Sequence, residues 1–164
     1  MADEVTRYLE SYQTLEREAE RLRQRLEDNR DKLRRITAIY GDRPRGGGED
    51  RNDKLARLAD METALAEAYL DASLRATEIE QLIEATDPGP ENVYRLVLTL
   101  RFLDGRDWDA VQYELHAAGI DCERRTLYNW YGRALNAVRE AYDKRNTERE
   151  GQNCPDYTPE ENDK

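Results

Sequence analysis

The feature that most constrains this chain is a heptad pattern of apolar residues that extends over residues 3–40. Its members recur in alternating steps of three and four, and no glycine or proline interrupts them. This spacing predicts one long helix whose apolar face is covered by another helix. The series consists of Val5, Tyr8, Tyr12, Leu15, Ala19, Leu22, Leu26, Asn29, Leu33, Ile36 and Tyr40. The polar Asn29 fits two interpretations, a buried residue that fixes register or a locally solvated position.

A second heptad series predicts a helix from about Asp53 to Thr86, with Met61 covering for the polar Glu62. Between the two helices, Pro44 and three consecutive glycines break the helix in the joint at residues 41–50. Equal lengths and a short joint predict an antiparallel coiled-coil hairpin over residues 3–86. Pairing between chains is the alternative, and the thin core of an isolated hairpin favours a homodimer. The second series consists of Leu55, Leu58, Leu65, Tyr69, Ala72, Ala76, Ile79 and Ile83.

The remaining sequence predicts a compact all-α unit at residues 91–145, after a Pro-Gly hinge at residues 87–90. Its three helices are expected at residues 91–103, 108–118 and 123–144. Asp104, Gly105 and Arg106 form the predicted first turn, and Gly119 ends the middle helix. The expected core lists Val93, Leu96, Val97, Leu100, Trp108, Val111, Leu115, Leu127, Trp130, Ala134, Leu135 and Val138. Residues 146–164, acidic and without periodicity, are expected to be a disordered tail.

Charge is distributed unevenly along the chain, whose net charge is -10. Residues 1–90 have 15 basic and 21 acidic side chains, whereas residues 91–146 have 9 of each. The stretch from Glu123 to Arg145 has six basic and three acidic residues, which gives +3. The last predicted helix is therefore the net-basic part of an acidic protein, and it is the part suited to phosphates.

A short helix, a turn with glycine and a longer helix that begins with basic residues are typical of a helix-turn-helix. With Leu127 facing the core, the outward side chains of the first two turns are Arg124, Arg125, Tyr128 and Asn129. Arginine reads guanine and asparagine reads adenine in the major groove of double-stranded DNA. Arg133, one turn further, suits a phosphate, and Thr126 suits a helix cap or a backbone contact. A structural bundle with a solvated charged face is the alternative.

Two motifs add a family resemblance. The segment from Leu100 to Gly105 with Trp108, followed by Arg125-Thr126-Leu127-Tyr128 and Gly132-Arg133-Ala134-Leu135, resembles region four of bacterial sigma factors. With the joint Pro44-Arg45-Gly46-Gly47-Gly48, residues 5–145 resemble phage-encoded transcriptional regulators of the RinA and ArpU types of late activator.

The resemblance implies a sequence-specific regulator of phage or prophage genes that is not an enzyme. It also implies host RNA polymerase as a partner, with Arg43 and Arg45 as contacts to phosphate or polymerase; a plain hairpin turn is the alternative. The chain departs from the family pattern between Gly119 and Arg125, where its turn is longer and Asp121 or Glu123 must serve as the cap.

Other classes of function find little support in the sequence. A lone His116 and the absence of a CxxC motif give no catalytic or metal site, and no cofactor is expected. No membrane-spanning run is present, and Cys122 and Cys154 are expected to be free thiols in the bacterial cytoplasm. Two alternative functions remain, a DNA-packaging adaptor like a small terminase subunit and an interaction protein that binds polymerase without reading DNA.

Overall fold

The computed structural model describes residues 3–40 and 48–152, with the side chains of residues 36–40, 48–51 and 149–152 outside the description. All regular elements in these ranges are helical, which confirms the all-α prediction. Arg43 and Arg45 lie outside the described residues. The elements are α1 (Glu4–Tyr40), α2 (Gly48–Glu84), η1 (Pro90–Asn92), α3 (Val93–Leu98), η2 (Thr99–Leu103), α4 (Trp108–Ala117) and α5 (Arg124–Gln152).

The chain divides into two compact units, Met1–Glu80 and Gln81–Lys164. The boundary lies in the last turns of α2, ahead of the hinge that the sequence predicts at residues 87–90. The residues between the boundary and the hinge include Leu82, Ile83 and Thr86, all of which are buried. Packing therefore places the end of α2 with the second unit, although the helix itself is continuous.

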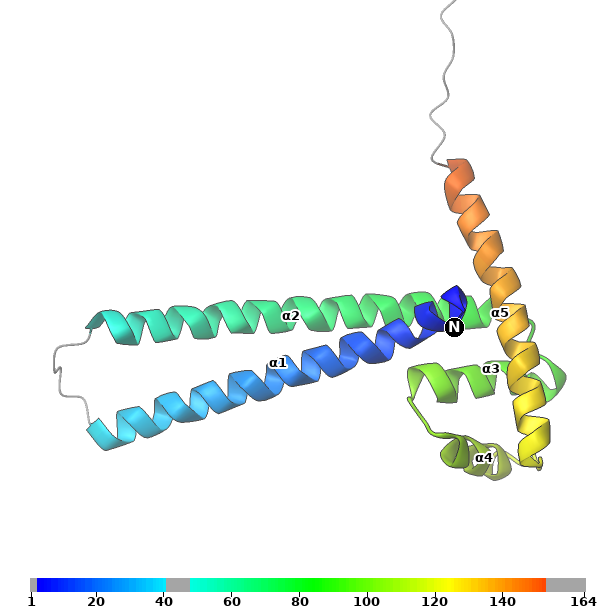
Figure 1. The fold of residues 1–164 in the computed structure, drawn as a ribbon, viewed down its shortest axis with the longest axis horizontal. Helices are drawn as coiled ribbons and strands as arrows, with labels where there is room; N and C mark the ends of the chain where they lie inside the picture. The colour runs from blue at the N-terminus through cyan, green and yellow to red at the C-terminus, as the bar shows by residue number, and fades with distance from the viewer. Residues whose placement is uncertain (1–2, 41–47, 153–164) are drawn as a thin grey trace, which may run out of the picture. The chain divides into compact units, whose positions relative to one another are not determined.

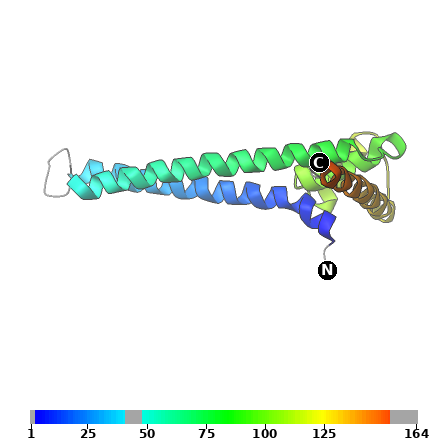
Figure 2. The same ribbon diagram turned by 90° about the horizontal axis from the view of Figure 1, so that it is seen from above.

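In the first unit, α1 and α2 lie side by side and run in opposite directions (Figures 1 and 2). The Tyr8 hydroxyl donates to a carboxylate oxygen of Glu78 at 3.0 Å near one end of the pair. Towards the joint, the Asn29 amide contacts the Met61 sulfur at 3.4 Å. From the first contact to the second, the residue number rises on α1 and falls on α2. This is the antiparallel register expected within one chain.

The buried face of this helix pair differs in places from the predicted one. Leu9, which the heptad series leaves out, is fully buried, whereas Asn29 is exposed. Leu55 and Tyr69 were predicted to face α1, but they are 47% and 44% exposed. Ala72 and Ile79, two other members of the same predicted series on α2, are buried as expected. The buried residues here are Val5, Leu9, Ala19, Leu26, Ala72 and Ile79.

On α2, Met61 takes the place of Glu62 at the contact with α1, as predicted. Met61 is half-buried while Glu62 is exposed and forms an ion pair with Arg30 of α1. The apolar neighbour thus occupies the position that the carboxylate cannot.

The Pro-Gly segment before α3 is held by specific bonds. The Arg95 guanidinium donates twice to the carbonyl of Thr86, at 3.0 and 2.9 Å. Gly89 has a φ of 69°, and a Cβ at this position would lie 2.5 Å from Cγ of Tyr94. Only glycine combines this left-handed backbone with an aromatic ring packed directly on it.

The helix predicted at residues 91–103 ends at Leu103 as expected, but its beginning is wrong and its last part is a π-helix. Glu91 and Asn92 have positive φ values of 50° and 62°, so the α-helix begins only at Val93. After Leu98 the chain continues as a π-helix, in which the amide of Asp104 donates to the carbonyl of Thr99 at 3.0 Å. Periodicity could not predict the late start or the π-helix, because the backbone conformation at both places depends on tertiary contacts.

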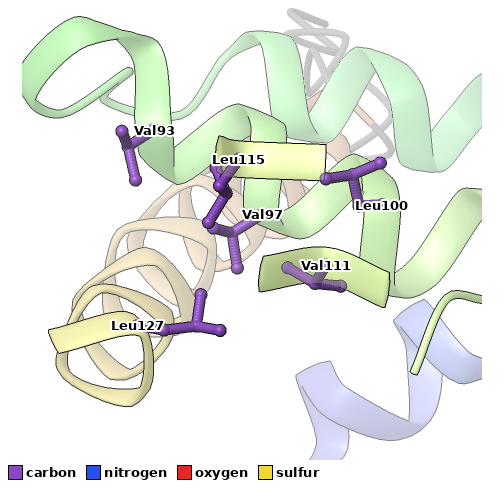
Figure 3. Packing of buried hydrophobic residues seen from close by; sticks show 6 residues of the cluster. All are labelled: Val93, Val97, Leu100, Val111, Leu115 and Leu127. Carbon is purple, nitrogen blue, oxygen red and sulfur yellow. The ribbon is translucent and has the colours of Figure 1, made fainter. Parts of the chain in front are cut away.

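The core of the second unit lies where α3, η2, α4 and α5 meet. Figure 3 shows the side chains that fill it, including Leu127 from α5 and Leu115 from α4. Most of the predicted core is confirmed, while Leu96, Trp108, Trp130 and Leu135 are only partly buried. Leu98 and Phe102 were not predicted, yet they are 0% and 2% exposed. The cluster consists of Val93, Val97, Leu100, Val111, Leu115 and Leu127.

The last helix is longer than predicted. α5 continues to Gln152, so the expectation of disorder is wrong for residues 146–152. These residues contain no proline, and the Thr147 hydroxyl donates to the carbonyl of Asp143 at 2.9 Å within the helix. Residues 153–164 lie outside the described residues.

Replacing Gly89 with alanine tests the packing before α3. We expect Gly89→Ala to lower the free energy of unfolding by about 2–5 kcal/mol, because it combines left-handed strain with a clash. Gly119→Ala is the matched control, since Gly119 has a φ of 82° but open space around its Cβ position. Urea titration should show a loss of about 1–2 kcal/mol for this control, from the backbone alone. Equal losses in the two variants would contradict the clash with Tyr94.

Candidate nucleic-acid interface

Helix α4 has a defined beginning and end. Its N-cap is Asp107, whose carboxylate accepts a hydrogen bond from the amide of Ala110 at 2.8 Å. At the other end, Gly119 takes the predicted left-handed conformation, with φ 82°. The amide of Ile120 donates to the carbonyl of Leu115 and that of Gly119 to the carbonyl of His116, both at 2.9 Å. This pair of bonds is a Schellman motif, which reverses the chain sharply after the helix.

The segment between α4 and α5 is fastened to α4. The Gln112 side-chain amide donates to the carbonyl of Cys122 at 3.0 Å. Asp121, one of the two predicted caps of α5, is paired with His116 instead. Ile120 and Cys122 pack against the core cluster. The longer turn is therefore held by α4, and it fixes where α5 begins.

Aromatic rings hold the first turns of α5 against the preceding elements. Trp108 at the start of α4 meets Tyr128 and Tyr131 edge to face, with ring centroids 5.0 and 4.8 Å apart. Tyr131 also stacks on the buried Phe102, at 6.2 Å. Aromatic pairs in these geometries stabilise beyond the area that they bury. The sequence identified Trp108 and Phe102 as motif residues but gave no indication of this cluster.

Two predicted site residues near the start of α5 are engaged within the chain. The Arg124 guanidinium forms an ion pair with Asp109 at 2.6 Å and lies 3.4 Å from the Tyr128 hydroxyl. This hydroxyl and the negative charge of Asp109 raise the pKa of Arg124 above its ordinary value. Tyr128 is 43% exposed, with part of its ring against Trp108.

The other predicted residues divide by their exposure. Arg125, Asn129 and Arg133 are all exposed, at successive turns of α5. Neither of the two arginines has an ion-pair partner among the described residues. Thr126 is half-buried and lies nearer the core side. The structure thus brings two unpaired cations and one amide together on a single face.

This face extends further than the sequence indicated. A hollow along α5 is lined by residues that include Asn129, Arg133, Asn136 and Arg139. Gly132 lies in the middle of it, and a Cβ on this glycine would have no atom within 4 Å. A glycine in a helix interior costs about 1 kcal/mol relative to alanine, so its presence here has no explanation inside the chain. The helical spacing from Asn129 to Asn136 and Arg139 was the signal that could have revealed the extension.

Two further classes of site are absent from the described ranges. Within residues 3–40 and 48–152, no cluster of three His, Cys, Asp or Glu side chains is placed to hold a metal ion. Nor does any helix in the part of the chain that the structure describes have the length and apolarity needed to cross a membrane. Comparison with protein-family models, curated proteins and solved structures gives no match to this chain.

Cys122 provides a chemical test of the turn before α5. Burial, followed by the charge of the neighbouring Asp121, raises the pKa of its thiol. A raised pKa means less thiolate at a given pH, so alkylation at pH 8 should be slower in the folded protein than in urea. Asp121→Asn should speed the folded reaction, and a Cys154→Ser background isolates Cys122. Equal rates in the folded and urea-unfolded protein would show that the thiol is not shielded by this turn.

Proposed function

We propose that this chain is a non-enzymatic, sequence-specific DNA-binding regulator, as its resemblance to phage late activators implies. In this proposal α4, the turn and α5 form a helix-turn-helix, and α5 enters the major groove of double-stranded DNA. The regulated genes would belong to a phage or prophage, and the protein would act in the cytoplasm of the bacterial host.

One observation carries the proposal most directly. α5 has an inner face fixed in the core by Leu127 and the aromatic cluster, while its outer face presents Arg125, Asn129 and Arg133. Arginine and asparagine are the side chains that read guanine and adenine by paired hydrogen bonds. Neither Arg125 nor Arg133 has an ion-pair partner among the described residues, which leaves their charge available to DNA.

The ion pair with Asp109 gives Arg124 a different role. Its charge is largely offset and its guanidinium is held beside Tyr128, so it contributes less to phosphate attraction than its neighbour. We assign Arg124 to positioning Tyr128 and the first turn of α5. Arg125 is the reader of bases, and Arg133 is the phosphate contact.

Single alanine substitutions test this assignment. Arg125→Ala should weaken binding to a duplex selected from a random pool by about tenfold or more, the effect of losing one bidentate contact. Arg133→Ala should weaken all duplexes alike and reduce the slope of log K against log salt by about 1. Arg124→Ala should have the smallest effect of the three. Fluorescence anisotropy over a salt series measures all of these quantities.

The control for these variants is Arg21→Ala, which removes an exposed arginine from α1. If Arg21→Ala weakens binding as much as Arg125→Ala, the attraction is non-specific and α5 is not the reader. If no duplex is enriched even at low salt, the protein is an interaction protein without a DNA role.

The same proposal assigns the coiled-coil hairpin to homodimer formation, with host RNA polymerase as a further partner that the resemblance implies. A stripe of uncharged, exposed side chains along α2 supports dimerisation. Leu70 and Leu74 within it are 60% and 57% exposed. In a chain with 38% charged residues, a row of exposed uncharged side chains is typical of a surface that contacts another protein. The stripe, in steps of three and four, consists of Leu55, Ala59, Thr63, Ala66, Leu70 and Leu74.

Introducing charge into the stripe tests the dimer. The double variant Leu70→Glu/Leu74→Glu should be monomeric in light scattering at a concentration where the wild type is dimeric, because charged side chains cannot be buried unpaired. Ala64→Glu, also exposed on α2 but outside the stripe, should leave the dimer intact. A double variant that stays dimeric would exclude this surface. Ring-sized wild-type oligomers would favour a DNA-packaging adaptor.

A further inference from the structure

Gly132 is anomalous in its surroundings. It lies in the interior of α5, where alanine is the more stable choice. Its φ is not positive, unlike those of Gly89, Gly105 and Gly119, so no left-handed backbone requires glycine. A Cβ would meet nothing within 4 Å, so internal packing does not require glycine either. The bare backbone of Gly132 is therefore open to a molecule that approaches α5 from outside.

The surroundings of Gly132 indicate the chemistry of that partner. Two guanidinium groups, from Arg133 and Arg139, and two carboxamides, from Asn129 and Asn136, line the hollow around it. No carboxylate is among the lining residues. The Asn136 oxygen accepts from Arg139 at 2.8 Å, which turns the amide nitrogen of Asn136 away from that bond and leaves it as a donor. Cations and N–H donors around an uncharged floor suit a phosphodiester, whose oxygens are all acceptors.

We propose that the sugar–phosphate backbone of one DNA strand packs directly on α5 at Gly132, between Arg133 and Arg139. This inference rests on the proposed function and adds to it a second contact region, beyond the base-reading residues at the start of the helix. The missing side chain allows a closer approach of the two backbones, so the flanking donors reach the same phosphate group. Asn136 and Arg139, which sequence reasoning did not select, thereby become DNA contacts.

Gly132→Ala separates this role from a structural one, because the two roles predict opposite signs. The substitution should raise the melting temperature of the full-length chain by roughly 2–4 °C, since alanine is the better helix former. It should nevertheless weaken binding to a double-stranded DNA of random sequence at low salt by about tenfold, comparable to the loss of one good contact. Gly132→Gln should weaken binding further, because its side chain fills the hollow.

Thr147→Ala is the matched control, an exposed position of α5 outside the hollow where alanine also favours the helix. It should leave DNA binding unchanged, which separates added helix stability from lost contact. A lower melting temperature for Gly132→Ala would show that the chain itself needs this glycine, and would overturn the inference. Unchanged DNA binding by Gly132→Ala, with a wild type that binds, would overturn the inference alone and leave the proposed function standing. A wild type that binds no DNA would overturn the proposed function together with this inference.

Discussion

Burial of Leu127 is the interaction on which the rest of the second unit depends. This side chain of the first turn of α5 is fully buried in the same cluster as Val97 of α3 and Val111 of α4. Truncating a leucine in such a position costs about 2–5 kcal/mol. Because Leu127 and the edge-to-face contacts of Trp108 fix the rotation of α5 about its axis, they also decide which residues of the helix point outward.

The net negative charge of the chain is compatible with a DNA-binding surface, because the positive and negative side chains are unevenly distributed over the molecule. Arg124 is paired with Asp109, and exposed arginines of the hairpin are also paired, Arg23 with Glu20 in the same helix and Arg30 with Glu62 across the two helices. Exposed pairs of this kind contribute little to stability. On the outer face of α5, neither Arg125 nor Arg133 has an ion-pair partner among the described residues. In the proposed function these two cations would attract phosphate locally, despite a net charge of -10.

The two long helices illustrate how far a heptad pattern extends as a predictor. It predicted both helices, because the spacing of apolar residues determines which face of a helix avoids water. The predicted start of the second helix at about Asp53 is wrong, since α2 begins at Gly48, inside the predicted joint. The heptad pattern did not distinguish the face of α2 towards α1 from its second, exposed apolar stripe. Leu55 satisfied the spacing but lies outside the contact, whereas Leu9 lies inside it. Both faces of α2 have apolar residues in steps of three and four, and only the packing against α1 shows which face is buried.

The sequence by itself determined the all-α class, the core helices of both units, the Gly119 turn and the set of basic residues on α5. These features depend on local periodicity and on the conformational freedom of glycine and proline, which neighbouring residues suffice to specify. The tertiary structure decided the late start of α3 at Val93, the pairing of Arg124 with Asp109 fifteen positions earlier, and the burial of Leu98 and Phe102. It also showed that the helix starting near Arg124 has in its interior a glycine with open space around its Cβ position. Such features depend on how α4 and α5 are rotated against each other, and no spacing within one helix contains that information.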